Sequence, residues 1–262
     1  MSAQLPLLSV ESLSKSYQGV HAVRGVSFQV QRGELLAMIG PNGAGKSSCF
    51  NMMNGQIRPS AGRVMIEGVD TTHYSPQKIF RLGVGRTFQI AETYLSMTVR
   101  ENVQMVLQSH RKGGLSLSAF FGRLGALYRD DAMALLALIG LDHQAERLCR
   151  ELPYGDVKRL ELAIALAGEP KLLLMDEPAA GMAAKERVAL MELTAKVVRE
   201  RHIGVLFTEH DMDIVFEHAT RVIVLNRGEI IATGTPNAVR ADPQVQAVYL
   251  GSGALYSHGE AH

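Results

Sequence analysis

The sequence has no tryptophan, two cysteines and no excess of charge of either sign. Cys49 and Cys149 lie far apart and form no C-x-x-C pair, so neither a disulfide framework nor a zinc site is predicted, and a reducing compartment is expected. Lysine and arginine (27) nearly balance aspartate and glutamate (26), which argues against a surface for nucleic acid and against a polybasic membrane anchor.

Long apolar runs are missing as well. Residues 172–175 and 222–225 are among the apolar runs, and each is far shorter than the roughly 20 residues that a membrane-spanning helix needs. Residues 1–10 lack the features of a secretory signal. We therefore expect a chain that is soluble by itself and that would reach a membrane only through a partner.

The hydrophobic pattern predicts a doubly wound α/β core. Strands are expected at residues 8–10, 22–30, 34–39, 63–68, 84–89, 172–175 and 205–208, with helices at 47–54 and 184–201. Residues from about 98 to 167 have helical spacing and form an inserted helical region, in which 112–125 is a loop or short helices. A hairpin at 221–232 and two short helices, capped by Thr235 and Asp242, complete the pattern.

A glycine-rich loop carries the first chemistry. It matches G-x-x-x-x-G-K-[ST] between a predicted strand and a predicted helix, the context that a phosphate-binding loop requires. Glycines allow backbone N–H groups to turn toward phosphate, and the helix presents its positive end to the same anion. Lys46 is expected to neutralise the β and γ phosphates of ATP, and Ser47 to bind Mg²⁺. The predicted nucleotide-binding residues here are Gly40, Pro41, Asn42, Gly43, Ala44, Gly45, Lys46, Ser47 and Ser48.

Two carboxylates, Asp176 and Glu177, follow the apolar strand at 172–175. Asp176 is expected to reach Mg²⁺ through its water shell, and Glu177 to position or polarise the attacking water. An acidic pair after a strand is by itself more often part of a solvated loop. The presence of the phosphate-binding loop in the same chain favours the catalytic interpretation.

Three further side chains are candidates on weaker grounds. His210 follows another apolar strand, where it could hydrogen-bond the γ phosphate, and Gln89 ends the strand at 84–89, where it could contact Mg²⁺ and the attacking water. Tyr17 could stack on adenine, because an aromatic face is a base-binding surface of modest specificity. Taken alone, each is also compatible with a solvated or packing role.

The order of these motifs resembles the nucleotide-binding subunits of ABC transporters. Leu152, Pro153, Tyr154, Gly155 and Asp156 stand where that family carries its signature sequence. The resemblance implies that this segment closes over ATP held by a second subunit, with the amino end of a helix at about 157–167 aimed at the γ phosphate.

The same resemblance implies an architecture. It is a P-loop NTPase core with a mostly parallel sheet, an antiparallel β subdomain and an inserted α-helical subdomain. One nucleotide-binding domain is expected over residues 1–251, with the helical subdomain at about 98–167 and a disordered tail at 252–262.

Residues 153–155, 177–181, 208–212 and 247–251 are similar to the branched-chain amino acid importer subfamily, whose members also carry aromatic amino acids, urea and short amides. The resemblance implies permease partners, an indirect link to a periplasmic solute-binding protein and a place on the cytoplasmic side of the inner membrane. Two different ATPase subunits commonly pair in that subfamily, so a heterodimer is expected and a homodimer stays open. The surface at 89–100 is expected to receive a cytoplasmic helix of the permease.

Two residues depart from the subfamily pattern. Asp156 replaces the usual glutamine, which brings a carboxylate near a triphosphate although it also favours the helix amino end. Ala183 replaces a polar side chain at the expected dimer seam. We expect the composite site that receives this chain's signature segment to be the weaker of two.

Three alternatives remain open. The chain could be the ATPase of a lipid or lipopolysaccharide exporter, or a soluble ABC-type ATPase acting on ribosomes or DNA, which usually has two fused cassettes or a long coiled-coil insertion. A P-loop small-molecule kinase would leave residues 152–156 and His210 without a role.

Overall fold

The computed structural model describes residues 5–87, 93–112 and 128–250. Gln89, residues 113–125 and the expected tail at 252–262 therefore lie outside the described residues. The strands are β1 (Leu8–Tyr17), β2 (Val20–Val30), β3 (Leu35–Ile39), β4 (Ala61–Ile66), β5 (Val69–Asp70), β6 (Val84–Thr87), β7 (Leu172–Asp176), β8 (Gly204–Thr208), β9 (Arg221–Asn226) and β10 (Glu229–Gly234).

The helices complete the element order. They are α1 (Lys46–Met53), α2 (Pro76–Arg81), α3 (Val99–Lys112), α5 (Arg129–Leu138), α6 (Tyr154–Ala167), α7 (Ala184–Arg201), α8 (Met212–His218), α9 (Pro236–Ala241) and α10 (Pro243–Leu250), with 3-10 turns at Asp142–Gln144 and Cys149–Glu151. No helix in the described ranges has the length and apolar character needed to cross a bilayer.

The larger sheet has the strand order β10-β9-β3-β8-β7-β6 within the described residues. Its neighbours pair in parallel except β9 and β10, which form the predicted antiparallel hairpin. Every residue of β3 and β8 is buried, as expected for strands covered on both faces. Because β3, β8 and β7 are parallel neighbours, the segments that follow them emerge at one edge of the sheet.

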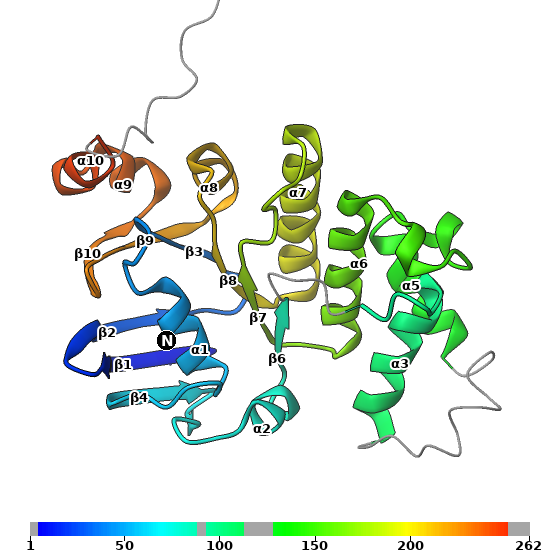
Figure 1. The fold of residues 1–262 in the computed structure, drawn as a ribbon, viewed down its shortest axis with the longest axis horizontal. Helices are drawn as coiled ribbons and strands as arrows, with labels where there is room; N and C mark the ends of the chain where they lie inside the picture. Colours follow the sequence, from blue (N-terminus) through cyan, green and yellow to red (C-terminus); the bar gives the residue numbers. More distant parts are fainter. Residues whose placement is uncertain (1–4, 88–92, 113–127, 251–262) are drawn as a thin grey trace, which may run out of the picture.

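The smaller sheet is antiparallel, with the order β2-β1-β4-β5, and lies to one side of the larger one (Figure 1). Helix α1 lies between the two sheets. Its buried residues Phe50 and Met53 share one core cluster with Val10 of β1 and with Leu36 and Met38 of β3. The helix that begins at the phosphate-binding loop is thus central to the molecule.

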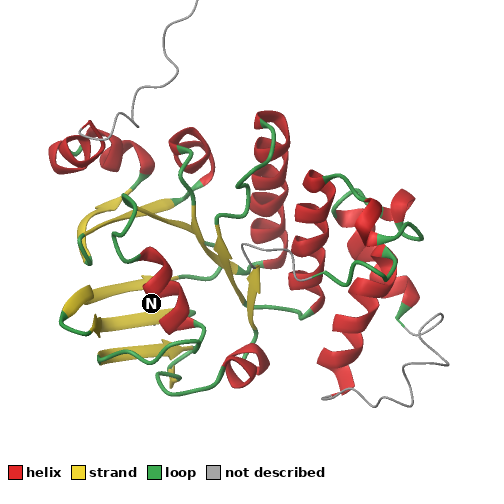
Figure 2. Ribbon diagram, in the orientation of Figure 1, coloured by secondary structure: helices red, strands yellow, loops and turns green. Residues whose placement is uncertain are grey.

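A second core cluster covers the opposite face of the larger sheet. There Ala37 and Ile39 of β3 pack with residues of α6, α7 and α8, and helices α3 and α5 extend this layer to the far end of the molecule (Figure 2). Alternation along β3 explains the division, because Leu36 and Met38 face one cluster and Ala37 and Ile39 the other.

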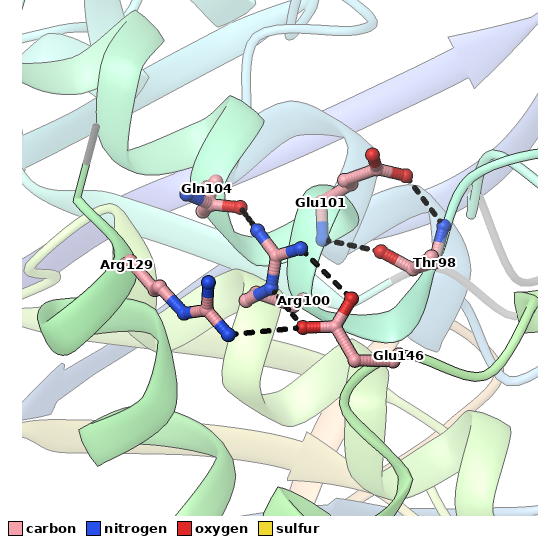
Figure 3. A network of polar contacts seen from close by, with 6 residues as sticks. All are labelled: Thr98, Arg100, Glu101, Gln104, Arg129 and Glu146. Carbon is pink, nitrogen blue, oxygen red and sulfur yellow. Dashed lines mark hydrogen bonds and ion pairs between the residues drawn. The ribbon is translucent and has the colours of Figure 1, made fainter. Parts of the chain in front are cut away.

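A polar network fixes the start of α3 to the turn after α5 (Figure 3). The buried Arg100 donates from Nε and Nη2 to the two carboxylate oxygens of Glu146, at 2.8 and 2.9 Å, and from Nη1 to Gln104. Arg129 contacts the same carboxylate at 3.5 Å. Hydrogen bonding to Arg100 lowers the pKa of Glu146, so the pair stays charged at neutral pH.

Most predicted elements are confirmed, with corrected bounds. The helix predicted at 184–201 agrees with α7 at both ends, whereas the helix predicted from about 157 begins three residues earlier, at Tyr154. Strand β1 continues to Tyr17 instead of ending at Val10, because Ser12 takes a φ of 49° and register shifts break the alternation that a strand pattern shows.

Two helices in the described part of the chain were not predicted. Helix α2 has Ser75 as its N-cap, whose hydroxyl accepts a hydrogen bond from the backbone N–H of Lys78, and Pro76 at its first position. Helix α8 is capped by Asp211, whose carboxylate accepts from the N–H groups of Asp213 and Ile214. Both cap sequences were signals in the chain, but helices of six and seven residues show too few turns to display a period.

Candidate functional site

The predicted phosphate-binding loop connects β3 to α1. The first turn of α1 receives no side-chain cap, because its N-cap position is Gly45, with a φ of 107°. The N–H groups of that turn are therefore available to an anion. Ser47 is exposed at this helix end, where its hydroxyl can reach a bound cation.

Glycine is required at two positions of the loop because the backbone passes very close to neighbouring strands. A Cβ atom at Gly40 would lie 2.2 Å from the carbonyl oxygen of Leu225, and one at Gly45 would lie 2.5 Å from that of Ala22. At Gly43, where φ is 77°, nothing lies within 4 Å of such an atom. The loop is thus packed at its ends and faces open space in the middle, as a phosphate cradle requires.

Lys46 is buried, with 7% of its surface exposed, and its Nζ donates to the carbonyl oxygens of Gly40 (2.7 Å) and Pro41 (3.2 Å). Burial lowers the pKa of Lys46, and the nearby Glu177 and Asp176 oppose that shift. A buried ammonium group that donates to neutral carbonyls gains from an anionic ligand. The position of Lys46 therefore suits phosphate.

Alternation along β7 sends its carboxylate toward α1. Leu172 and Leu174 belong to the core cluster around α1, Leu173 and Met175 to the cluster on the other face, and Asp176 continues the first series. The side chain of Asp176 is 13% exposed, at the same sheet edge as the phosphate-binding loop. The structure thus brings Asp176, Glu177 and Lys46 together.

Thr208 is a site residue to which the sequence analysis gave no role. Its hydroxyl donates to Oδ1 of Asp176 (2.8 Å) and accepts from the backbone N–H of Glu177 (3.0 Å). The pairing of Asp176 with Thr208 across β7 and β8 makes this contact. Thr208 is fully buried and holds both predicted carboxylate residues in place.

Glu177 and His210, predicted separately, are in contact. Nε2 of His210 lies 2.5 Å from Oε1 of Glu177, and the histidine side chain is 51% exposed whereas that of Glu177 is 20% exposed. Glu177 has a φ of 50°, an uncommon conformation for a residue other than glycine. Strained backbone of this kind often occurs at functional sites.

Glu209 is a second residue to which sequence reasoning assigned no role. Its buried carboxylate accepts from the backbone N–H groups of Ala179 (2.9 Å) and His210 (3.2 Å). Burial raises its pKa, and the hydrogen bond from Ala179 opposes the shift. Glu209 therefore joins the loop after Glu177 to the loop that carries His210.

The predicted signature segment is tied to the same loop. The hydroxyl of Tyr154 donates to the carbonyl oxygen of Ala180 (3.1 Å), and its ring lies against Gly181. Gly155 is buried, and a Cβ atom there would lie 2.8 Å from the carboxylate of Glu186. In this structure Gly155 is therefore covered, whereas Pro153 and Tyr154 are exposed.

Asp156 lies in the first turn of α6, and its side chain has two partners. Its Oδ2 accepts from Nε2 of Gln144 (2.8 Å), and its Oδ1 lies 3.9 Å from Arg159. The guanidinium of Arg159 offsets part of the negative charge of Asp156, the charge that is expected to weaken the composite ATP site.

Tyr17 ends β1 and is 44% exposed. It pairs with Val20 of β2, and β2 then passes the loop, since the carbonyl of Ala22 lies against Gly45. An exposed aromatic ring near the phosphate-binding loop is compatible with the predicted contact to adenine.

The residues present fit a magnesium ion that arrives with a nucleotide. Mg²⁺ prefers oxygen ligands, keeps several waters and is usually held by one or two carboxylates together with phosphate oxygens. Ser47 and Asp176 supply such oxygens at one edge of the sheet. In the described part of the chain no group of three or more His, Cys, Asp or Glu side chains is arranged to hold a metal by itself.

Comparison with known proteins decides the family. A family model described as ABC transporter matches residues 23–180. The high-affinity branched-chain amino acid transport ATP-binding protein LivG of Escherichia coli is 37% identical over 250 residues, which are 94% of this chain and 98% of LivG. The chain belongs to the ABC transporter family. It is an ATP-binding subunit and an ATPase of that family.

Other comparisons agree on the fold and refine the position of this ABC ATPase. Its structure superposes on a nucleotide-free ATP-binding cassette from an ABC transporter with a TM-score of 0.81 and 30% identity, covering 93% of this chain and 98% of that one. A model described as branched-chain amino acid ATP-binding cassette transporter matches residues 229–254. The lipopolysaccharide export system ATP-binding protein LptB of Haemophilus influenzae is 32% identical over 94% of this chain and 98% of its own.

Proposed function

We propose that this ABC ATPase binds ATP and Mg²⁺ at the edge of the larger sheet where the phosphate-binding loop and the carboxyl ends of β7 and β8 meet. Lys46 and the backbone N–H groups of residues 40–48, except Pro41, would hold the phosphates. Tyr17 would contact the adenine, and Ser47 and Asp176 the cation. Glu177 would position the attacking water, with His210 and Gln89 acting on the γ phosphate and the water. The contact of 2.5 Å between His210 and Glu177, next to a buried Lys46, is the observation that supports this assignment best.

The ATP site is proposed to be completed by a second nucleotide-binding subunit. Residues 152–156 lie at the exposed amino end of α6, where Pro153 and Tyr154 are accessible to a partner. Tyr154 contacts Ala180 and Gly155 lies against Glu186, and these contacts hold the segment but leave its outer surface exposed. A heterodimer is proposed, as the resemblance to the branched-chain amino acid importer subfamily implies, and a homodimer is the alternative.

We propose that the subunit drives import of a branched-chain amino acid or a related small polar solute. Support comes from the match of residues 229–254 to the branched-chain family model and from the full-length similarity to LivG and to BraF of Pseudomonas aeruginosa, which is 36% identical over 252 residues. The similarity to LptB is the reason to keep lipopolysaccharide export as a second candidate.

The permease is proposed to bind near the start of α3. Tyr94 and Leu95 are both 57% exposed in the described part of the predicted surface at 89–100, and large apolar side chains at adjacent exposed positions suit a partner helix. Arg100, by contrast, is buried against Glu146 and supports the surface from below. The subunit would then sit on the cytoplasmic side of the inner membrane, linked through the permease to a periplasmic solute-binding protein.

Reconstitution tests the proposed solute class. The subunit would be purified with the membrane proteins that it captures and placed in vesicles with ATP enclosed on the side of the ATPase. We expect ATP-dependent transport of labelled leucine or a related amino acid or amide, absent in Glu177→Gln. Extraction of lipopolysaccharide without amino-acid transport would favour the exporter. If the subunit captures no membrane protein and yet hydrolyses ATP, both candidate functions are contradicted.

A further inference from the structure

Arg86 brings a second cation to the site, in addition to Lys46. It lies on β6 with 14% of its side chain exposed, and its Nη2 is 3.6 Å from Oδ2 of Asp176. The alternation of β6 explains the direction of the side chain. Gly85 packs against Leu173 on one face of the sheet, so Arg86 points to the other, where α1 lies.

Two amide side chains hold the guanidinium on its far side. Nη1 of Arg86 donates to Oδ1 of Asn51 (3.1 Å) and to Oε1 of Gln56 (2.8 Å). Asn51 belongs to α1, the helix that begins at the phosphate-binding loop, and its carbonyl oxygen accepts from the N–H of Gln56. Arg86 thus connects the phosphate-binding helix to the carboxylate at the end of β7.

Both oxygens of Asp176 are therefore engaged by side chains of neighbouring strands. Thr208 of β8 donates to Oδ1, and Arg86 of β6 faces Oδ2. We infer that Arg86 is a positioning residue that orients Asp176 for the magnesium ion bound with ATP. This inference rests on the proposed role of Asp176.

The charge and the geometry of Arg86 have opposite effects on Mg²⁺. Repulsion between two cations, taken alone, predicts that a neutral side chain at position 86 tightens Mg²⁺ binding. Loss of orientation predicts weaker binding, and removing the outer hydrogen-bonding partner of a metal ligand typically costs about 10- to 100-fold in metal affinity. The positive charge of Arg86 is already offset by Asp176 itself, so orientation dominates.

Nucleotide binding to the full-length Arg86→Met variant separates these effects. Binding of a non-hydrolysable ATP analogue would be measured by titration calorimetry in EDTA and over a series of Mg²⁺ concentrations. We expect the Mg²⁺ concentration that gives the half-maximal gain in affinity to rise by about 10- to 100-fold. Affinity in EDTA stays within about twofold of the unsubstituted chain, because the phosphate-binding loop is unchanged.

Arg221→Met is the matched control. Arg221 is also a partly exposed arginine that forms an ion pair with a carboxylate, that of Glu34, at 2.7 Å. Its backbone on β9 lies beside Leu36, near the start of β3 and away from the phosphate-binding edge. We expect it to leave the Mg²⁺ dependence unchanged. If Arg86→Met does not fold, Gln56→Ala removes one exposed anchor of the guanidinium and should shift the Mg²⁺ dependence in the same direction.

Asp176→Asn distinguishes failure of the inference from failure of the proposed site. If Asp176→Asn weakens Mg²⁺ binding whereas Arg86→Met leaves it unchanged or tightens it, the inference on Arg86 is wrong and the proposed site stands. If neither substitution changes the Mg²⁺ dependence, the proposed role of Asp176 fails, and the inference fails with it.

Discussion

Two buried polar residues, Thr208 and Glu209, give the site its geometry at the scale of single side chains. Thr208 bonds the carboxylate of Asp176 and the backbone N–H of Glu177, and Glu209 accepts from the backbone N–H groups of Ala179 and His210. Neither residue contacts solvent appreciably. A buried polar group that is fully bonded limits the positions open to its partners. The orientation of the candidate catalytic residues is therefore set by residues that need not touch ATP.

Glu177→Gln should stop turnover without removing nucleotide binding. Groups that position or deprotonate an attacking water contribute roughly 10²- to 10⁴-fold to rate, and Gln cannot accept the proton. ATP turnover and the dissociation constant for ATP would be measured on the same preparation. A loss of rate below tenfold would show that another residue positions the water.

Glu209 should make stability fall as pH rises. Its folded-state pKa is raised from the ordinary value of 4.5 by burial, so the folded protein holds this proton more tightly than the unfolded chain. The stabilising contribution is complete below about pH 4.5 and is lost as pH rises through the higher folded-state pKa.

Urea unfolding from pH 4 to 8 measures that contribution. The difference in free energy of unfolding between Glu209→Gln and the unsubstituted chain should change in favour of the variant as pH rises through this window. Glu200→Gln, at a half-exposed position on α7, is the control and should show no such trend. A flat difference for Glu209→Gln would mean that burial of its charge is compensated.

At the scale of elements, helix ends determine what the site can do. The amino end of α1 has no side-chain cap and is open to phosphate, whereas that of α3 is closed by a reciprocal pair in which Thr98 and Glu101 each bond the other's N–H. The amino end of α6 is intermediate, because Glu186 covers Gly155 while Tyr154 stays exposed. The free N–H groups of an uncapped helix end can bind an anion, whereas those of a capped end are already bonded within the protein.

Tyr154→Phe should lower the ATPase rate, and the free-energy equivalent of this loss should exceed the loss in free energy of unfolding. The hydroxyl fixes the carbonyl of Ala180 in the loop that follows Glu177, and a hydrogen bond of this kind contributes about 0.5–1.5 kcal/mol, or about 2- to 10-fold in rate if it acts on the reaction. ATPase rates of the reconstituted complex and urea unfolding would be compared. Tyr74→Phe, a tyrosine outside the site, is the control, and equal rates in the two variants would remove Tyr154 from the catalytic assembly.

Asp156→Gln tests whether this chain weakens the composite site. We expect higher ATP affinity or a higher rate in the reconstituted complex, because a carboxylate near the phosphates is removed. The bond from Gln144 can be kept by the amide oxygen of Gln. No gain in rate or affinity would show that Arg159 already neutralises the carboxylate.

At the scale of the whole molecule, much of the architecture was predictable from local pattern. The phosphate-binding loop, β7 with its two carboxylates, α7 and the C-terminal hairpin were each predicted from a few adjacent residues. Arg86, Thr208 and Glu209 were not, because their roles depend on contacts between strands far apart in the sequence. The start of α6 was placed three residues late, since Pro153 is a cap without a side-chain hydrogen bond.

ATP with Mg²⁺ should stabilise the entire chain, because α1 lies between both sheets and begins at the phosphate-binding loop. At 100 times the dissociation constant, a ligand specific for the folded state adds about 2.7 kcal/mol, which corresponds to roughly 5–10 °C in the unfolding midpoint of a domain this size. Lys46→Ala should abolish the shift. Thermal unfolding with and without nucleotide measures it, and a shift that persists in Lys46→Ala would place the nucleotide elsewhere.

The alternation of β7 has a genetic consequence. Leu172, Leu174 and Asp176 share one face of the sheet. Deletion of a single codon within β7 would therefore turn the Asp176 side chain to the opposite face and exchange the leucine and methionine side chains between the two core clusters. The same deletion in the turn at 142–147 would disturb the contacts of Ala145 and Glu146 with the start of α3 but leave the sheet in register. In a library of single-codon deletions selected by growth or by protein yield, variants with a deletion in β7 should therefore disappear before variants with a deletion in that turn.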